Sequence, residues 1–264
     1  MIRRCLILLL ISYESLAQTY VGPNYQALGS AGTALEGIYS LTANPAGLVG
    51  VERFTTSVNY QHHFFLADVN TQALLLGVPT RLGAFGMALS RFGLKAAYSD
   101  LKASFAFAKR LSPRFALGLI ASYHQLYVPS YLKETALSVD VGMQYHLPEG
   151  AIIGVQYTNV GNENYGQIVH GTIPAYVKAG VSYPWTHVMV TADVVYHATH
   201  QLGGNVGIEY NIGDIIFLRG GVSVNPLQQH LGFGLCWPHF TFGTAFTFHP
   251  QLGVSPQIGL CYAF

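Results

Sequence analysis

The chain has 264 residues, of which 50% are hydrophobic and only 9% are charged, and its formal net charge is +1. Soluble domains usually carry about 25% charged residues, so this deficit indicates that much of the outer surface faces lipid rather than water. The nearly neutral balance argues against nucleic acid or a strongly acidic or basic partner.

Residues 1–17 have the pattern of a secretory signal peptide. Arg3 and Arg4 precede an apolar run, and small residues follow it up to Ala17. We expect the mature protein to begin near Gln18. Cys5 would leave with the signal peptide.

Residues 18–50, which we call the N-terminal segment, do not read as strands. They are rich in Gly and Ala and end in Asn44-Pro45-Ala46-Gly47. Small residues let a backbone pass close to other chain segments. Pro45 disfavours helix at Asn44, so we expect a short helix over about 34–42 that stops there. Asn44 could bond neighbouring backbone to hold the turn, and an ordinary turn without further role is the simpler alternative.

From Val51 onward, side chains alternate with the period of two that is typical of strands with two different faces. No apolar run reaches the ~20 residues of a membrane helix, so a closed β-barrel is the remaining way to satisfy backbone hydrogen bonds in hydrocarbon. The fold predicted for residues 51–264 is therefore an all-β, antiparallel transmembrane barrel of about fourteen strands. The expected spans are 51–63, 69–79, 82–92, 99–109, 114–127, 134–146, 150–159, 173–183, 187–197, 202–211, 214–225, 229–237, 240–249 and 256–264.

The connections between these strands support a barrel, because short and longer ones alternate as short periplasmic turns and longer outer loops do. Tyrosines lie near both ends of the strands, as expected for aromatic girdles at the two membrane interfaces. A secreted β-sandwich is the main alternative, but it has no reason for this aromatic placement with so few charges.

Six charged residues fall on the polar faces of the strands, which in a barrel line the lumen: Lys102, Asp140, Lys178, Asp193, Glu209 and Arg219. Opposite charges there most often pair with one another or with a plug. Lining a polar permeation path is the functional alternative.

Catalytic and metal-binding patterns are missing from the sequence. There is no Ser/His/acid set and no nucleotide-binding glycine loop. His62-His63 and His197-x-x-His200 lie at expected outer loops without Cys or carboxylate partners, which is weak evidence for a metal site. We therefore expect no enzyme activity, no metal and no cofactor. Cys236 and Cys261 lie on strands separated by a third, too far apart for a disulfide.

The last strand, QIGLCYAF, alternates and ends the chain on Phe264. Together with Tyr262, this ending resembles the C-terminal recognition signal of outer-membrane barrels. The resemblance implies that the protein lies in the bacterial outer membrane.

The N-terminal segment resembles that of the FadL family of outer-membrane proteins, which includes the PorV and PorQ proteins of the type IX secretion system. The matching residues are Gly29, Gly32, Thr33, Asn44, Pro45, Ala46 and Gly47. The resemblance implies that residues 18–50 fold back as a hatch into the lumen of a fourteen-stranded barrel, and that the protein comes from a Bacteroidota-type bacterium.

Two functions follow as hypotheses. The favoured one is a PorV-like accessory subunit that docks, within the lipid of the outer membrane, against a larger secretion or assembly complex. The alternative is a FadL-type transporter of small hydrophobic molecules. The longest expected outer loop, residues 160–172, is polar and too short to build a large apolar groove, which favours the first hypothesis.

Overall fold

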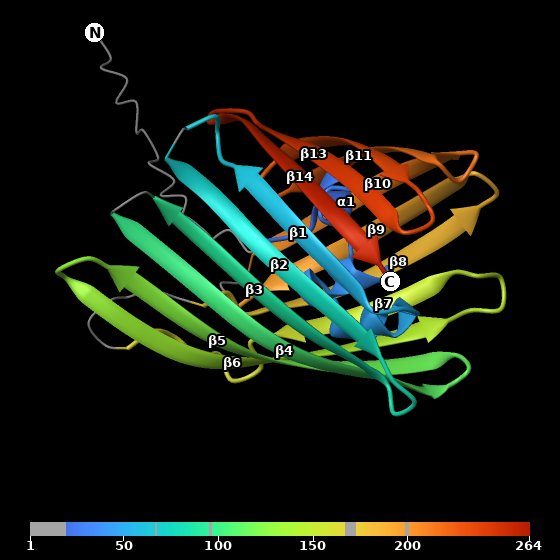
Figure 1. Cartoon of the computed structure of the whole chain (residues 1–264), viewed down its shortest axis with the longest axis horizontal. Helices are drawn as coiled ribbons and strands as arrows, with labels where there is room; N and C mark the ends of the chain where they lie inside the picture. The colour runs from blue at the N-terminus through green and yellow to red at the C-terminus, as the bar shows by residue number, and fades with distance from the viewer. Residues whose placement is uncertain (1–19, 67, 95–96, 167–172, 199–200) are drawn as a thin grey trace, which may run out of the picture.

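The computed structural model describes residues 20–66, 68–94, 97–166, 173–198 and 201–264. The expected signal peptide therefore lies outside the described residues. Fourteen antiparallel strands of this part of the chain close into one barrel, in which each strand pairs with its sequence neighbours and β1 pairs with β14 (Figure 1). The predicted fold class is confirmed. The strands are β1 Thr55–His62, β2 Val69–Pro79, β3 Ala84–Leu94, β4 Tyr98–Ser112, β5 Phe115–Val128, β6 Leu132–His146, β7 Ile152–Thr158, β8 Tyr176–Trp185, β9 Val188–His197, β10 Leu202–Ile212, β11 Ile216–Val224, β12 Gln228–Cys236, β13 Phe240–His249 and β14 Gly253–Ala263.

Alternation along each strand separates a lipid-facing side from a lumen-facing side. On β6, Leu137 is 69% exposed on the outside, whereas Ser138 and Gln144 are 4% and 0% exposed on the inside. Apolar side chains on the outside of a barrel contact lipid instead of water, which explains the low charge content. The alternation of side chains along each strand is a local property of the sequence. It determines that the outer surface of the barrel is apolar and that the lumen surface is polar.

The barrel has a short-turn end and a long-loop end. Thr55 of β1 pairs with Ala263 of β14 at the short-turn end, and the Phe264 amide donates to the Phe54 carbonyl at 2.9 Å. The longest connection, residues 159–175, joins β7 to β8 at the other end. Short turns mark the periplasmic side of such barrels, so the start of β1 and the end of β14 both lie on that side.

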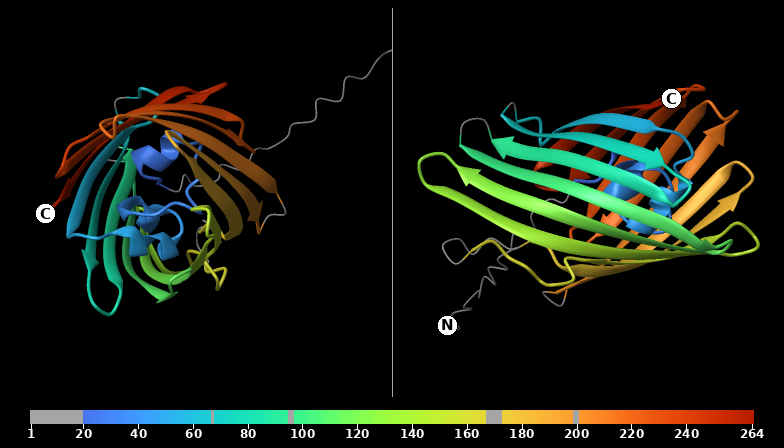
Figure 2. Two further views of the ribbon diagram at one scale, coloured as in Figure 1. Left: turned by 90° about the vertical axis from the view of Figure 1, so that its right-hand side faces the viewer. Right: turned by 60° about the horizontal axis from the view of Figure 1, so that its bottom comes forward.

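The described part of the N-terminal segment, residues 20–50, lies inside the barrel (Figure 2). It contains α1 Pro23–Ala27 and two 3₁₀ helices, η1 Ile38–Thr42 and η2 Pro45–Gly50. Its apolar side chains, among them Leu41 and Leu48, pack against Leu75 and Ile120 of the wall to form the hydrophobic core. Burial of apolar surface therefore holds this segment in the lumen.

The helix expected over 34–42 is wrong: only residues 38–42 are helical, as one short 3₁₀ turn. The carbonyls of Thr33, Ala34 and Leu35 accept hydrogen bonds from the wall instead of from a helix. Gly37 then takes φ of 115°, which lies outside helical geometry. The wall begins at Thr55 rather than near Val51, because η2 runs up to Gly50.

Among the residues that the structure describes, no helix combines the length and the apolar composition needed to cross a membrane.

Candidate functional site

Asn44 joins the N-terminal segment to two strands of the wall. Its Nδ2 lies 2.8 Å from the Thr33 carbonyl, 3.0 Å from the Met143 carbonyl of β6 and 3.3 Å from the Val155 carbonyl of β7. Its Oδ1 accepts from the Ala46 amide at 3.1 Å. Asn44 is fully buried, so each of these bonds replaces one that water can no longer make. The residue both caps η2 and fixes it to the barrel.

Thr33 binds strands β9 and β6 of the wall. Its amide and hydroxyl both donate to Oδ2 of Asp193 on β9, at 3.1 and 2.7 Å. Its carbonyl accepts from Gln144 Nε2 at 3.1 Å. Charge-assisted bonds to a carboxylate that is 3% exposed are among the stronger polar contacts of a protein.

Small residues let this segment touch the strands. A Cβ added at Gly118 would overlap the backbone of Pro45 and Ala46, and one at Gly142 would overlap the Asn44 side chain. Within the segment, a Cβ on Gly47 would meet the Leu35 carbonyl. Bulk at these positions would force the segment away from the wall.

Gly29 and Gly32 also allow the N-terminal segment to pack closely against its neighbours. Gly29 adopts φ of 70°, and a Cβ there would lie 2.8 Å from the Val222 carbonyl of β11. A Cβ on Gly32 would lie 2.6 Å from the Tyr25 ring. Both glycines are therefore required by contact or conformation.

Glu209 and Arg219 form a further contact with the segment. Nε of Arg219 on β11 lies 2.6 Å from Oε2 of Glu209 on β10, and Arg219 Nη1 donates to Asn24 Oδ1 at 3.3 Å. This pair faces the lumen, and it orders α1 as well as the two strands. Two opposite charges on the polar face meet here.

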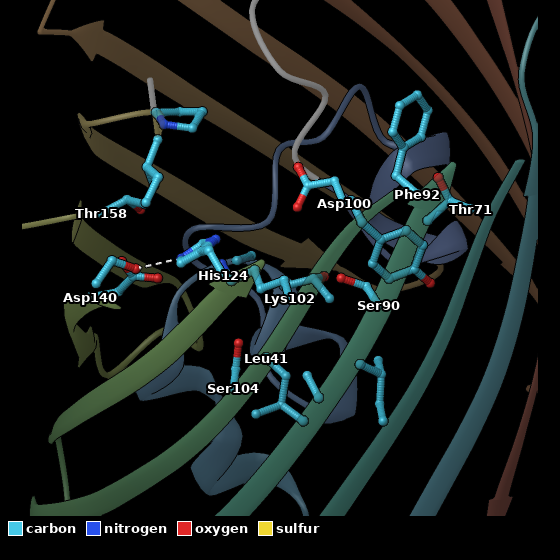
Figure 3. Close-up of a pocket in the computed structure, with 18 of the residues that line it drawn as sticks. Leu41, Thr71, Ser90, Phe92, Asp100, Lys102, Ser104, His124, Asp140 and Thr158 are labelled. Atoms are coloured by element: carbon cyan, nitrogen blue, oxygen red, sulfur yellow. Dashed lines mark hydrogen bonds between the residues drawn. The ribbon is translucent and has the colours of Figure 1, made fainter. Parts of the chain in front are cut away.

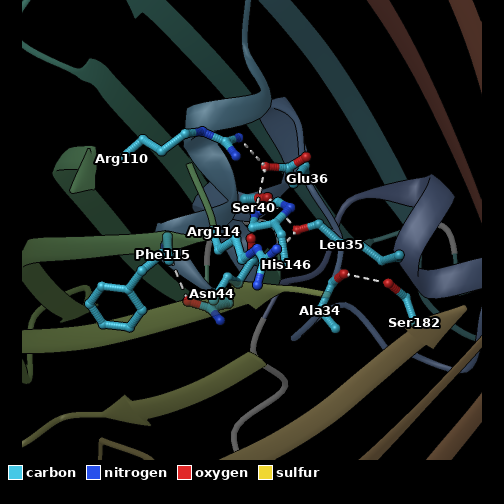
Figure 4. Close-up of polar contacts among 12 residues, drawn as sticks. Ala34, Leu35, Glu36, Ser40, Asn44, Arg110, Arg114, Phe115, His146 and Ser182 are labelled. Carbon is cyan, nitrogen blue, oxygen red and sulfur yellow. Dashed lines mark hydrogen bonds and ion pairs between the residues drawn. The ribbon is translucent and has the colours of Figure 1, made fainter. Parts of the chain in front are cut away.

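A fourth contact lies at the periplasmic end. Oε1 of Glu36 accepts from Arg110 Nη2 at 3.0 Å and lies 3.5 Å from His146 Nε2 (Figure 4). The side chains are partly exposed, so this contact contributes less than the buried ones. It attaches the N-terminal segment to the wall at the periplasmic end as well.

Above the segment, toward the long-loop end, a cavity of about 100 Å³ remains (Figure 3). Leu41 and Ala43 of the segment form its floor. Lys102 and Asp140 lie on its wall, and the other four predicted lumen charges do not line it. Its size lies below the 300–1,000 Å³ typical of ligand pockets, so it accepts at most one small molecule at a time.

The polar wall of this cavity is an ordered network. His124 Nε2 lies 2.8 Å from the Ser138 hydroxyl, and Asp140 Oδ1 accepts from the Asn159 amide at 2.8 Å. Within the described part of the chain, Lys102 forms no salt bridge. Its ammonium group therefore shares the cavity with Asp100 and Asp140 but makes no direct ion pair with either.

Tyr165, in the connection after β7, contacts two residues that line this cavity. The Tyr165 hydroxyl donates to Asp100 Oδ1 at 3.3 Å, and the Tyr165 ring meets the His124 ring edge-on with centroids 6.4 Å apart. Burial, with the neighbouring Asp100 carboxylate, raises the pKa of Tyr165 well above its usual range. The hydroxyl thus stays protonated and remains a donor.

The remaining predicted residues lie elsewhere. Lys178 Nζ sits 5.1 Å from the centroid of the Tyr176 ring. Phe264 packs on Tyr262 with ring centroids 4.6 Å apart at the seam of the barrel. Cys236 and Cys261 are free.

Of the four histidines weighed for a metal site, His63 is buried and bonds Thr71 at 2.8 Å, and His200 lies outside the described residues. No cluster of three potential metal ligands occurs in the part of the chain that the structure covers.

Sequence reasoning did not single out Gln144, Asp100 or Tyr165. The alternation places Gln144 on the lumen face, but it gives no sign that its amide bonds the carbonyls of Thr33 and Leu35. Tyr165 lies in a polar loop, where no pattern indicates that the ring turns inward. These contacts join distant parts of the chain, so no local signal could have found them.

No protein-family model and no curated protein matches the sequence. Solved structures match it in fold. The toluene transporter TodX of Pseudomonas putida has 13% identity and a TM-score of 0.68, covering 93% of this chain and 98% of that one. The monoaromatic hydrocarbon channel CymD has 14% identity and a TM-score of 0.65, with 92% and 97% covered. A FadL homologue of Pseudomonas aeruginosa has 11% identity and a TM-score of 0.64, with 93% and 99% covered.

At these identities the likeness establishes the fold alone. The chain thus has the FadL-like fold that its N-terminal segment resembles, over nearly its whole length. A closed fourteen-stranded barrel of this fold with an apolar outer face is a protein of the bacterial outer membrane.

Proposed function

We propose that the protein is a channel for small, predominantly apolar molecules in the outer membrane. One observation carries the proposal: the bonded N-terminal segment lies across the lumen and leaves a small cavity facing the long-loop end. A wide water-filled pore would have no such floor. The similar barrels TodX and CymD are named as channels for toluene and monoaromatic hydrocarbons, which supports transport.

The geometry suits selection by size. A molecule that arrives from the outside passes Tyr165 and meets the floor formed by Leu41 and Ala43. Because a cavity of about 100 Å³ holds one small ring, long chains would not fit without movement of the segment. The channel would therefore admit small solutes and exclude lipids and proteins.

Uptake by intact cells tests this function. Bacteria that lack their own hydrocarbon channels and express this protein should accumulate a radiolabelled small aromatic compound faster than cells without it. Ala88→Phe fills the cavity and should abolish the gain, whereas Ala121→Phe, which adds the same ring on the lipid-facing side of β5, should not. Equal uptake with Ala88→Phe and the unmodified protein would contradict the proposal.

An accessory subunit of a larger outer-membrane complex, of the PorV type, is the second candidate function. The charge at the periplasmic rim favours it. The turns before β3 and β5 expose Arg81 and Arg114, and Lys109 is exposed near the end of β4, whereas the turns after β6 and β10 carry Glu149 and Asp214. Such a polarised rim could orient a charged partner.

Gentle detergent purification followed by proteomics separates the two candidates. A stoichiometric partner that is lost with Arg81→Gln and Lys109→Gln, but kept with Lys133→Gln at the opposite end, would support the accessory role. Recovery of the barrel alone with a bound apolar molecule would support transport. The comparisons with known structures already support transport better than the accessory role.

A further inference from the structure

The lining of the cavity combines apolar side chains with hydrogen-bonding groups. Leu75, Ala88 and Phe92, from β2 and β3, offer apolar contact, and the hydroxyl residues Thr71 and Ser90 lie on the same two strands. Lys102, His124 and Asp140, from β4 to β6, offer hydrogen-bonding groups. Figure 3 shows His124 and Asp140 on one side of the cavity and Phe92 on the other. A ligand that matches this lining has both an apolar part and a hydrogen-bonding group.

A pure hydrocarbon would fit poorly against the hydrogen-bonding groups. It would displace water from the Lys102 ammonium, which forms no salt bridge within the described residues, and offer no acceptor in return. Desolvating a charge without a replacement partner is costly. The cavity therefore selects against the simplest aromatic hydrocarbons.

A carboxylate would also fit poorly. Asp100 and Asp140 both line the cavity with Lys102, so two carboxylates face one ammonium group. A third negative charge would meet like charge at short range, which is unfavourable in a poorly hydrated space. The charge balance favours a neutral ligand.

Size limits the apolar part of the ligand. A dry cavity of roughly 150 Å³ in another protein holds benzene, and the cavity here measures about 100 Å³ and opens outward. One aromatic ring or a short alkyl group is the largest body that suits it. A hydroxyl group would satisfy the hydrogen-bonding groups, because it donates and accepts at once.

We propose that the channel binds small neutral molecules with a single ring and a hydroxyl group, that is, the phenol class. The ring packs against Phe92 and Leu75, and the hydroxyl donates to a carboxylate of the lining and accepts from Lys102. This assignment rests on the proposed channel function and names its substrate class. It differs from the hydrocarbons named for the similar barrels.

Binding of matched fluorinated ligands tests the assignment. The full-length protein in lipid nanodiscs is titrated with 4-fluorophenol, 4-fluorotoluene and 4-fluorobenzoate, and ¹⁹F line broadening reports binding. Nanodiscs that contain Ala88→Phe give the broadening from lipid alone, which is subtracted. We expect 4-fluorophenol to bind roughly tenfold more tightly than 4-fluorotoluene, since a site that hydrogen-bonds a hydroxyl discriminates against an analogue without it. We expect no binding of 4-fluorobenzoate.

Lys102→Met should bring the two neutral ligands to nearly equal affinity, while Lys133→Met at the exposed start of β6 should leave the preference intact. A heat-modifiability gel confirms that each variant is folded, and the preference of the unmodified protein stands as a test without any variant. Equal or tighter binding of 4-fluorotoluene overturns the phenol assignment. If cells nevertheless take up a small aromatic compound, the channel function survives that result, whereas absence of uptake and binding for all ligands overturns both.

Discussion

At the scale of the residue, a few buried polar side chains hold the N-terminal segment. Asn44 uses both its amide nitrogen and its oxygen, and Thr33 uses its amide, hydroxyl and carbonyl. Such groups contribute mainly because their partners would otherwise be buried without a hydrogen bond. The glycines act in the opposite way, since the absence of a side chain permits the contact.

Asn44→Ala should lower the free energy of unfolding by about 1–3 kcal/mol, because it takes one donor from the buried carbonyls of Thr33 and Met143 and removes the acceptor of the Ala46 amide. Urea unfolding in detergent micelles, followed by tryptophan fluorescence, measures the change. Asn164→Ala removes one exposed 3.2 Å bond in the loop after β7 and serves as the control, with an expected change below about 0.5 kcal/mol. Equal effects of the two substitutions would rule out a special role for Asn44.

Gly118→Ala should destabilise the protein by about 1–3 kcal/mol, because the added methyl group overlaps the backbone of Pro45. Gly220→Ala is the matched control on another strand, where the nearest atoms to an added Cβ lie 3.9 Å away. The same unfolding assay compares them. If the Gly118 variant is as stable as the Gly220 variant, the segment does not press on β5 as described.

At the scale of the element, the N-terminal segment is attached on several sides. β6, β7 and β9 bind residues 33–44 through hydrogen bonds, and β11 to β14 contact α1. Apolar side chains of η1 and η2 fill the space against β2 to β5. Because this element is attached on all sides, it forms a fixed floor of the lumen.

Deletion of residues 22–48 should raise the single-channel conductance in a planar lipid bilayer, since it removes the floor from the lumen. A heat-modifiable band on a gel verifies that the shortened barrel is closed. Arg110→Gln, which loses only the exposed ion pair with Glu36, should leave the conductance low. An unchanged conductance in a closed, shortened barrel would mean that the segment does not plug the lumen.

At the scale of the whole molecule, closure depends on the pairing of the first strand with the last. β1 and β14 are paired from Thr55 with Ala263 to Gln61 with Gln257. Beyond the strand, the Phe264 amide bonds Phe54, and the two rings lie 4.9 Å apart. Closure leaves no strand edge unpaired in lipid, which is the condition for stability there.

Removal of Phe264 should reduce the folded fraction in the outer membrane several-fold, because the seam loses a backbone hydrogen bond and an aromatic contact. The heat-modifiable band in isolated outer membranes reports the folded fraction. Phe248→Ala removes an exposed ring from β13 away from this seam and should have a smaller effect. A normal folded fraction without Phe264 would contradict its proposed role in barrel assembly.

The sequence by itself determined the barrel, because side-chain alternation is a local property that marks every strand and both of its faces. The predicted span 240–249 coincides with β13, and 69–79 with β2. Tertiary structure alone decided the path of residues 33–44 and the cavity above them. Asn44 meets Met143 and Val155, and Thr33 meets Asp193, across more than 90 residues of chain. Such contacts depend on where the segment lies in the closed barrel. There, side chains of the wall donate hydrogen bonds to the carbonyls of residues 33–35, which would have accepted from amides in a local helix.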